Sequence, residues 1–258
     1  MPENDDLMLL IGAAHASADI ARKFWKQSPE TWDKDAGAGP VTEADLAIDK
    51  MLHADLLAAR PDYGWLSEET EDDTARLKHD RVFIIDPIDG TRAFIKGSKT
   101  FAHSLAVAHK GQVTAAVVFL PMLDKLYIAT SAMPASLNGR PIAPSQPKPD
   151  QTPTVLATNC NFKPERWKNG APPYERHLRA SLAYRLCLVA EGRFDAMLTL
   201  RPTWEWDVAA GALIAQKAGA IVTDKTGAKP RFNSPHPQLN GVLAAGPVLH
   251  KAIRSELG

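Results

Sequence analysis

Apolar residues near the N-terminus recur every three or four positions, which is the spacing of an amphipathic helix. Residues 5–26 carry this pattern and predict a first helix. A second helix is expected from Thr42, which stands three residues before Asp45 as in a capping box, and Pro61 ends it. The polar, glycine-bearing residues 32–40 predict a loop between the two helices.

The apolar pattern changes to that of β-strands from residue 81. Short runs rich in β-branched and aromatic residues alternate with turn signals, which predicts a meandering antiparallel sheet. The expected strands are 81–86, 103–110, 113–120 and 125–130. Six prolines between residues 132 and 153 exclude regular elements there, so this segment is the expected boundary between two halves.

Helices and strands alternate beyond the proline-rich segment, as in an α/β arrangement. Helices are expected over residues 177–192 and 207–218, each ended by a glycine. Further elements are expected as strands at 154–159, 194–200, 220–224 and 241–246 and as a closing helix at 248–257. The chain is therefore predicted to form an α+β half, residues 1–140, and an α/β half, residues 154–258, in one compact unit.

The composition narrows the range of ligands. With 30 basic and 30 acidic residues the 258-residue chain has no net charge, so no overall field attracts a nucleic-acid polymer or an anionic membrane. The N-terminus lacks the pattern of a signal peptide, and no run of about 18 apolar residues predicts a membrane span. Cys160 and Cys187 have no CxxC partner, which argues against zinc. A cytoplasmic protein is expected, and any anionic ligand must be held locally.

The hexapeptide DPIDGT, which begins at Asp86, follows a strand that is apolar enough to be buried on both faces. Asp86 and Asp89 leave the carboxyl end of this strand three residues apart, and Pro87 stiffens the turn between them. Gly90 allows a ligand to approach closely, and its amide and that of Thr91 can point at an anion. A metal on the acids with a phosphate on the amides fits the motif. Taken alone, an Asp-Gly turn is also explained by a helix cap beside a solvated acid.

Other acids recur at similar junctions of the expected elements, which weakens that alternative. They are Glu43 and Asp45, Glu68 and Glu69, and Glu205 and Asp207. Carboxylates that converge from several elements favour magnesium or manganese over zinc. Two such ions roughly 3.5–4 Å apart would generate a hydroxide nucleophile and neutralise a phosphate ester. The sequence has no serine elbow, Walker loop or HExxH helix. An aspartyl-phosphate formed on Asp86 is the covalent alternative.

Four motifs, in this order, resemble those of the inositol monophosphatase superfamily of magnesium-dependent, commonly lithium-sensitive phosphatases. They are VTEAD at 41–45, SEE at 67–69, DPIDGT at 86–91 and WDVAAG at 206–211, followed by the similar AGAIVTDKTG. The resemblance covers nearly the whole chain. It implies a layered αβαβα sandwich of two halves, the sugar phosphatase fold, with the site between the halves. It also implies hydrolysis of a phosphate monoester, a small phosphorylated metabolite, by a metal-activated water.

The resemblance further implies the ligands of two magnesium ions, for which manganese is a substitute. Glu68, Asp86 and the carbonyl oxygen of Ile88 would hold one ion. Asp86, Asp89 and Asp207 would hold the second. Because Asp207 lies beyond the proline-rich segment and the other ligands lie before it, the site would join both halves.

Catalytic and phosphate-binding roles follow from the same resemblance. Asp45 would support a third ion or its waters, and Thr91 near it would orient and help deprotonate the attacking water together with Glu68. The amides of Gly90 and Thr91 would receive the phosphate. Lys34 matches a lysine near the site in some relatives, and is otherwise a solvated loop residue.

Departures from the family pattern concern the substrate. Leu200 stands where inositol phosphatases place an acid on the inositol hydroxyls, and the nearest acid is Glu205. Expected substrate contacts are Asp89, Gly90, Thr91, Glu205 and Asp207. The stretches PTWEWDVAAG and DGTRAFIKG look closer to bacterial 3'(2'),5'-bisphosphate nucleotidases, and DGTRAF also resembles histidinol-phosphate phosphatases.

The expected substrate is therefore 3'-phosphoadenosine 5'-phosphate, with inositol 1-phosphate and then histidinol phosphate as alternatives. Arg185, Arg201, Lys96 and Lys99 are available for a second phosphate, or act as surface salt-bridge partners. A silent binding protein of the same fold is the alternative class, but such a protein would be expected to have lost an acid or Thr91, and none is missing. Relatives in the superfamily include dimers and monomers, so a homodimer is an alternative to a monomer.

Overall fold

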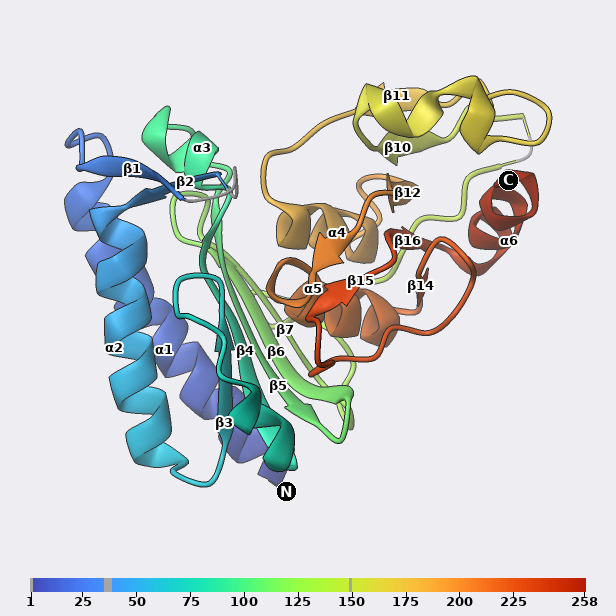
Figure 1. Ribbon diagram of the computed structural model, residues 1–258. Coiled ribbons are helices and arrows are strands. Elements are labelled where there is room, and N and C mark those ends of the chain that lie inside the picture. The colour runs from blue at the N-terminus through green and yellow to red at the C-terminus, as the bar shows by residue number, and fades with distance from the viewer. Residues whose placement is uncertain (1, 35–38, 149) are drawn as a thin grey trace.

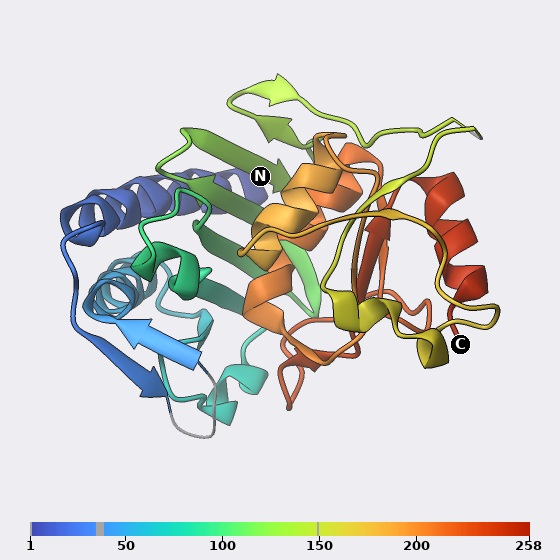
Figure 2. The ribbon, with the colours of Figure 1, turned by 90° about the horizontal axis from the view of Figure 1, so that it is seen from above.

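The computed structural model describes residues 2–34, 39–148 and 150–258. Among them, helices and two large sheets alternate in α, β, α, β and α layers (Figures 1 and 2). The layered architecture that the family resemblance implies is therefore confirmed. The side chain of Lys34 is outside the described part of the chain, and so is its predicted place near the site.

Helices α1 (Pro2–Phe24) and α2 (Glu43–Ala59) cover one face of the larger sheet (Figure 1). The predicted capping box begins α2. The Thr42 hydroxyl accepts a hydrogen bond from the amide of Asp45, and the Asp45 carboxylate accepts one from the amide of Thr42. Both helices begin and end within a few residues of the predicted bounds.

The larger sheet has seven strands in the order β3-β4-β5-β6-β7-β8-β9 among the described residues. They are β3 (Gly64–Ser67), β4 (Arg81–Asp89), β5 (Ala102–His109), β6 (Gln112–Leu120), β7 (Lys125–Thr130), β8 (Ser136–Leu137) and β9 (Arg140–Pro141). From β4 to β9 each strand is antiparallel to the next, which confirms the predicted meander, and β3 lies parallel to β4.

Both faces of the seven-stranded sheet are buried. Phe83 and Ile85 belong to the core formed with α1 and α2, whereas Val82 and Ile84 belong to the core formed with the helices of the C-terminal half. Successive side chains of a strand point to opposite faces, so a strand covered on both sides must be apolar throughout. This explains the unbroken run RVFII before the DPIDGT motif.

Two short hairpins occupy segments that the sequence predicts to be irregular. β1 (Thr31–Lys34) pairs with β2 (Gly39–Thr42), and β8 pairs with β9 inside the proline-rich segment. Asn138 and Gly139 turn the second hairpin with φ values of 49° and 76°, which two-residue hairpin turns require. Pro141 is tolerated because it lies in an edge strand. Both hairpins are too short for a periodic pattern to reveal them.

The C-terminal half contains a mixed sheet of five strands, in the order β11-β10-β12-β16-β14, among the described residues. They are β10 (Thr154–Leu156), β11 (Glu175–His177), β12 (Ala196–Thr199), β14 (Ile221–Thr223) and β16 (Val242–Ala245). β10 is parallel to both neighbours, and β16 is antiparallel to both of its neighbours. The short strands β13 (Thr203–Trp204) and β15 (Gln238–Leu239) form a separate pair.

Helices α4 (Leu182–Ala190) and α5 (Glu205–Ala218) lie between the two sheets, and α6 (Pro247–Glu256) covers the outer face of the smaller sheet (Figure 1). Short helices are α3 (Thr91–Ile95), η2 (Thr74–Lys78), η3 (Asn159–Phe162) and η4 (Pro164–Arg166). A side chain at Gly211 of α5 would place its Cβ 2.8 Å from the Leu186 side chain, so glycine permits the close approach of α5 to α4.

The helix predicted over residues 177–192 is shorter than expected. It begins only at Leu182, because the Ser181 hydroxyl caps it by accepting from the Tyr184 amide at 2.9 Å. Part of the segment before it, Glu175–His177, forms the edge strand β11. The apolar residues of the segment suggested a helix, but the serine cap determines where the helix starts.

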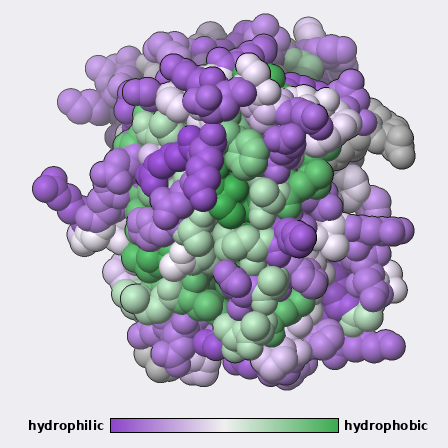
Figure 3. Space-filling view, turned by 90° about the vertical axis from the view of Figure 1, so that its left-hand side faces the viewer, coloured by the Kyte–Doolittle hydropathy of each residue, from purple (hydrophilic) through white to green (hydrophobic). Residues whose placement is uncertain are grey.

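The side of the molecule on which α1 and α2 lie shows apolar residues between hydrophilic ones (Figure 3). Met8 on α1 is 67 % exposed and Leu46 on α2 is 44 % exposed. In the described part of the chain, no helix has the length and apolar character needed to cross a bilayer.

Candidate metal centre and active site

The DPIDGT motif begins at a bulge near the end of β4. Asp86 pairs with Ser104 and Asp89 with Ala102, so β4 advances three residues where β5 advances two. In a regular strand residues three apart point to opposite faces, and one extra residue brings them to the same side. The bulge therefore places Asp86 and Asp89 on the wall of one pocket. Gly90 then takes a φ of 98°, which favours glycine, and α3 begins.

Asp86 lies at the centre of an acidic group. It is 1 % exposed, and neither of its carboxylate oxygens has a hydrogen-bond partner among the described residues. Oxygens of Glu68, Asp86 and Asp207 lie within 4.8 Å of one another. Burial first, and then the charges of Glu68, Asp89 and Asp207, raises the pKa of Asp86 well above its ordinary value. A buried carboxylate without a donor is unfavourable unless a cation pairs with it, so these residues fit a hard divalent cation such as magnesium.

The two other acids of this group come from different elements. Glu68 follows the end of β3, and its loop is held against α2 because the hydroxyls of Ser67 and Thr70 both donate to Asp49. Asp207 lies in the first turn of α5. Burial, followed by the neighbouring carboxylates, raises the pKa of Asp207 well above its ordinary value. The loop after β3, the end of β4 and the start of α5 therefore each bring one acid to the same place.

Asp89 is anchored to the start of α4. Its Oδ2 accepts hydrogen bonds from the Ser181 hydroxyl and from the Ala183 amide, both at 2.6 Å. Burial raises the pKa of Asp89 to about 6, although these hydrogen bonds oppose the rise. Ser181 thus both caps α4 and orients Asp89. Sequence reasoning missed this role because Ser181 is 92 residues from Asp89 and belongs to none of the four motifs.

Thr91, which lines the same pocket, is hydrogen-bonded to Asp45. The Thr91 hydroxyl lies 3.2 Å from Oδ1 of Asp45 and 3.1 Å from the carbonyl oxygen of Ile88, so its single proton serves one acceptor at a time. Oδ2 of Asp45 accepts from the amide and the hydroxyl of Thr42. Asp45 is fully buried and is fixed by the helix cap as well as by Thr91.

The acidic residues line a pocket of about 350 Å³. Its walls are Gly39, Pro40, Glu68, Asp86, Asp89, Gly90, Thr91, Arg92, Leu178, Ala180 and Asp207. No motif indicated Leu178 or Ala180, which the shortened start of α4 brings to the pocket. A larger pocket of about 570 Å³, between α6 and the proline-rich segment, has no carboxylate among the residues that line it. The acidic pocket is therefore the candidate active site.

Glu205 is not in this pocket, although the sequence predicts it as a substrate contact. It is fully buried, and its carboxylate accepts hydrogen bonds from the Asn233 amide at 2.6 Å and from the Ser234 amide and hydroxyl at 3.0 and 2.6 Å. All three donors belong to Asn233 and Ser234, which do not line the acidic pocket. The position of Glu205 therefore gives no support to a role in substrate contact. Glu205 and Asp207 are only two residues apart at the start of α5, but of the two only Asp207 lines the acidic pocket.

Arg185 on α4 lies close to the acidic pocket. Its Nε donates to the carbonyl of Arg179 at 2.6 Å, and Nη2 donates to the carbonyl of Ala180 at 3.3 Å. Burial lowers the pKa of Arg185, while its attraction to Asp89 and Asp207 opposes that change. Of the four basic residues that the sequence offers for a second phosphate, Arg201 and Arg185 both lie near enough to Asp207 to oppose the rise of its pKa, and Arg185 also braces one wall of the pocket.

The fold and this carboxylate pocket together define a metal-dependent phosphatase of the layered αβαβα type. The model of the inositol monophosphatase family matches residues 6–257. The chain belongs to this family and is a magnesium-dependent phosphatase.

Several known proteins are similar over most of the chain. The Nus factor SuhB of Escherichia coli strain K12 is 32 % identical over 235 residues, which cover 86 % of this chain and 85 % of that protein. An inositol-1-monophosphatase of Rhizobium meliloti is 32 % identical over 224 residues, or 82 % of each chain. Among solved structures, an IMPase of Thermotoga maritima superposes with a TM-score of 0.84 at 26 % identity, and covers 97 % of this chain and 96 % of its own.

Proposed function

We propose that the acidic pocket hydrolyses an inositol monophosphate with the help of magnesium bound by its carboxylates. The observation that carries the proposal is the buried carboxylate of Asp86, which has no donor among the described residues and lies within 4.8 Å of carboxylate oxygens of Glu68 and Asp207. The similar protein named inositol-1-monophosphatase supports this substrate. The name of this relative favours inositol 1-phosphate over 3'-phosphoadenosine 5'-phosphate, the substrate that the stretches PTWEWDVAAG and DGTRAFIKG suggest.

The proposed ligands follow the arrangement of the acids. Glu68, Asp86 and the Ile88 carbonyl oxygen would hold one ion, and Asp86, Asp89 and Asp207 would hold a second. The closeness of Glu68, Asp86 and Asp207 supports Asp86 as the ligand that both ions share. Asp89 has Oδ2 engaged with α4, so Oδ1 is the atom that we assign to the metal.

Bound magnesium supplies positive charge for the phosphate and lowers the pKa of a coordinated water. The Thr91 hydroxyl would orient the attacking water. When its proton is donated to Asp45 or to the Ile88 carbonyl, its lone pairs are available to accept a hydrogen bond from the water. Glu68 would take up the proton that the water loses as its oxygen bonds to phosphorus, and the inositol oxygen would leave as its own bond to phosphorus breaks and would take a proton from solvent. The Gly90 and Thr91 amides, at the pocket wall, would receive the phosphate oxygens.

A nucleoside 3',5'-bisphosphate is the second candidate substrate, because Arg185 lies near the pocket. This cation is attracted to Asp89 and Asp207, and a substrate with a second phosphate would gain from it. An inositol monophosphate carries one phosphate and would gain less. Arg185→Met should therefore raise the KM for the bisphosphate several-fold more than the KM for inositol 1-phosphate.

Phosphate release from inositol 1-phosphate, 3'-phosphoadenosine 5'-phosphate and histidinol phosphate, measured with and without magnesium, tests the proposal. We expect the highest kcat/KM for inositol 1-phosphate and background release without magnesium. A preference for the bisphosphate by tenfold or more would reverse the order of the two candidates. Release that is equal with and without magnesium would contradict the metal assignment.

A further inference from the structure

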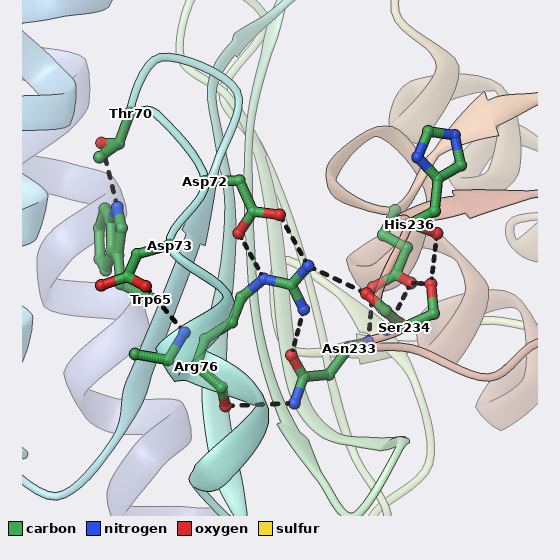
Figure 4. A network of polar contacts seen from close by, with 10 residues as sticks. Trp65, Thr70, Asp72, Asp73, Arg76, Asn233, Ser234 and His236 are labelled. Carbon is green, nitrogen blue, oxygen red and sulfur yellow. Dashed lines mark hydrogen bonds and ion pairs between the residues drawn. The ribbon is translucent and has the colours of Figure 1, made fainter.

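Arg76 is a buried arginine that connects the two halves of the chain. It lies in η2, eight residues after Glu68, and is 2 % exposed. Its Nε and Nη2 donate to the two carboxylate oxygens of Asp72 at 2.6 and 2.9 Å, as a fork (Figure 4). The guanidinium plane is therefore held from its own segment.

The same guanidinium also reaches the C-terminal half. Nη1 donates to Oδ1 of Asn233 at 2.6 Å, and Nη2 donates to the carbonyl oxygen of Ser234 at 2.9 Å (Figure 4). These residues are more than 150 positions further along the chain. Asn233 adopts a φ of 59°, a left-handed conformation that costs free energy in a residue other than glycine. The contacts to Arg76 hold it in that conformation.

Glu205 binds the other side of this loop. Its Oε2 accepts from the Asn233 amide, and its Oε1 accepts from the amide and the hydroxyl of Ser234. Glu205 is in the first turn of α5, and Asp207 follows two residues later on the same turn. An unbroken series of hydrogen bonds thus runs from the segment after Glu68 to the turn that carries Asp207.

Both ends of the series contact strands of the larger sheet. At one end, a Cβ added to Gly64 in β3 would lie 3.1 Å from the Cα of Arg76, so η2 packs directly against the strand that leads to Glu68. At the other end, the Ser104 hydroxyl in β5 donates to the carbonyl of Trp206 at 3.0 Å. A buried charge that loses one of its partners is strongly destabilised, so a shift of either end of the series that broke these hydrogen bonds would be unfavourable.

We propose that Asp72, Arg76, Asn233, Ser234 and Glu205, here called the inter-half bridge, form a positioning device that sets the distance between Glu68 and Asp207 and thereby preforms the metal site. The inference rests on the proposed role of these two acids as metal ligands. Glu205 is then a positioning residue that orients Asp207, and it does not contact the substrate. This also explains why an acid stands two residues before the metal ligand, yet outside the pocket.

Calorimetric titration of magnesium into the metal-free protein tests the bridge in the Glu205→Gln variant. Both carboxylate oxygens of Glu205 accept from backbone N–H groups, whereas the amide nitrogen of glutamine is a donor. In the variant, one of these N–H groups therefore loses its acceptor, and the hydrogen bond on that side is broken. We expect magnesium to bind about ten- to a hundredfold more weakly, as is typical when a group that orients a metal ligand is removed. At saturating magnesium, kcat should recover most of its original value, because every residue that touches the substrate is retained.

Asp195→Asn is the matched control. Asp195 is buried and accepts three hydrogen bonds, from the Ser145 hydroxyl and from the amide and hydroxyl of Thr154, but it lies outside the acidic pocket. The control should change stability without changing magnesium affinity. Ser234→Ala is the milder bridge variant, which loses one hydroxyl and should weaken binding by about two- to fivefold.

The outcomes separate this inference from the proposed function. If Glu205→Gln and Ser234→Ala are folded and bind magnesium as tightly as the parent, the bridge has no positioning role. If Asp195→Asn weakens binding as much as they do, the effect is one of general stability and the inference is also overturned. If the parent protein itself binds no magnesium, the proposed function fails with it.

Discussion

Replacing Asp89 by Asn removes the negative charge of this buried side chain but can retain its hydrogen bonds to α4. The variant therefore separates the effect of the charge from the effect of the hydrogen bonds. The amide oxygen of Asn can accept from the Ser181 hydroxyl and the Ala183 amide, as Oδ2 of Asp89 does. The negative charge is lost, however, and with it one proposed ligand of the second ion. We therefore expect a variant that folds with its contact to α4 intact, but binds magnesium poorly and has lost activity.

The expected change in stability follows from the pKa of Asp89. Burial raises this pKa from 3.8 to about 6 in the folded, metal-free protein. Between these two values the unfolded chain releases its proton while the folded chain retains it, so the free energy of unfolding falls as the pH rises. Each pKa unit corresponds to about 1.4 kcal/mol, and the full loss at pH 8 is therefore about 3 kcal/mol. The asparagine side chain cannot ionise and avoids this loss.

Urea unfolding of the parent and of Asp89→Asn in EDTA measures the difference. The variant should be more stable by about 3 kcal/mol at pH 8 and by about half as much at pH 5, which is roughly 6–12 °C in Tm at the higher pH. Asp195→Asn, buried outside the pocket, should show no such gain and serves as the control. If Asp89→Asn is no more stable than the parent at pH 8, the buried charge of ionised Asp89 does not lower the free energy of unfolding as we expect.

Three further predictions concern the reaction, the metal and the core. Thr91→Ala should lower kcat more than it raises KM, since orienting the water matters mainly in the transition state, and a change confined to KM would reduce Thr91 to a phosphate ligand. Magnesium should raise Tm more at pH 8 than at pH 5. Burial raises the pKa of the three aspartates in the pocket, so protons compete with the ion at the lower pH. Equal increases in Tm at the two pH values would contradict this. Gly211→Val should cost about 1–3 kcal/mol in urea unfolding, because its side chain would overlap Leu186, and an unchanged midpoint would show that α4 and α5 can move apart.

Much of the fold could be predicted because the long helices and strands have clear patterns of apolar residues. The strands of the meander are buried on both faces and therefore apolar throughout, and α2 has a capping box that marks its first turn. The hairpins whose strands have only two to four residues escaped prediction, since the pairing of such short strands depends on contacts that no local pattern records. The start of α4 was misplaced because apolar residues precede the Ser181 cap.

The acids of the pocket could be recognised because they recur at the ends of elements, and the structure brings Glu68, Asp86 and Asp207 together. What the sequence did not reveal is the direction of each side chain. Glu205 stands beside Asp207 in the chain but binds the loop at Asn233, and Ser181 holds Asp89 from 92 residues away. Such partners are set by the packing of the two halves, which local spacing does not encode.

The most direct test of the metal-dependent site is phosphate release by Asp86→Asn compared with the parent, from inositol 1-phosphate over a range of magnesium concentrations. Asp86 is the buried acid for which the described residues provide no hydrogen-bond donor, and we assign it to both ions. The parent should release phosphate in proportion to bound magnesium, and the folded variant should stay at the background of the EDTA control at every concentration. Release by Asp86→Asn at the rate of the parent would contradict the assignment of this pocket as the metal centre.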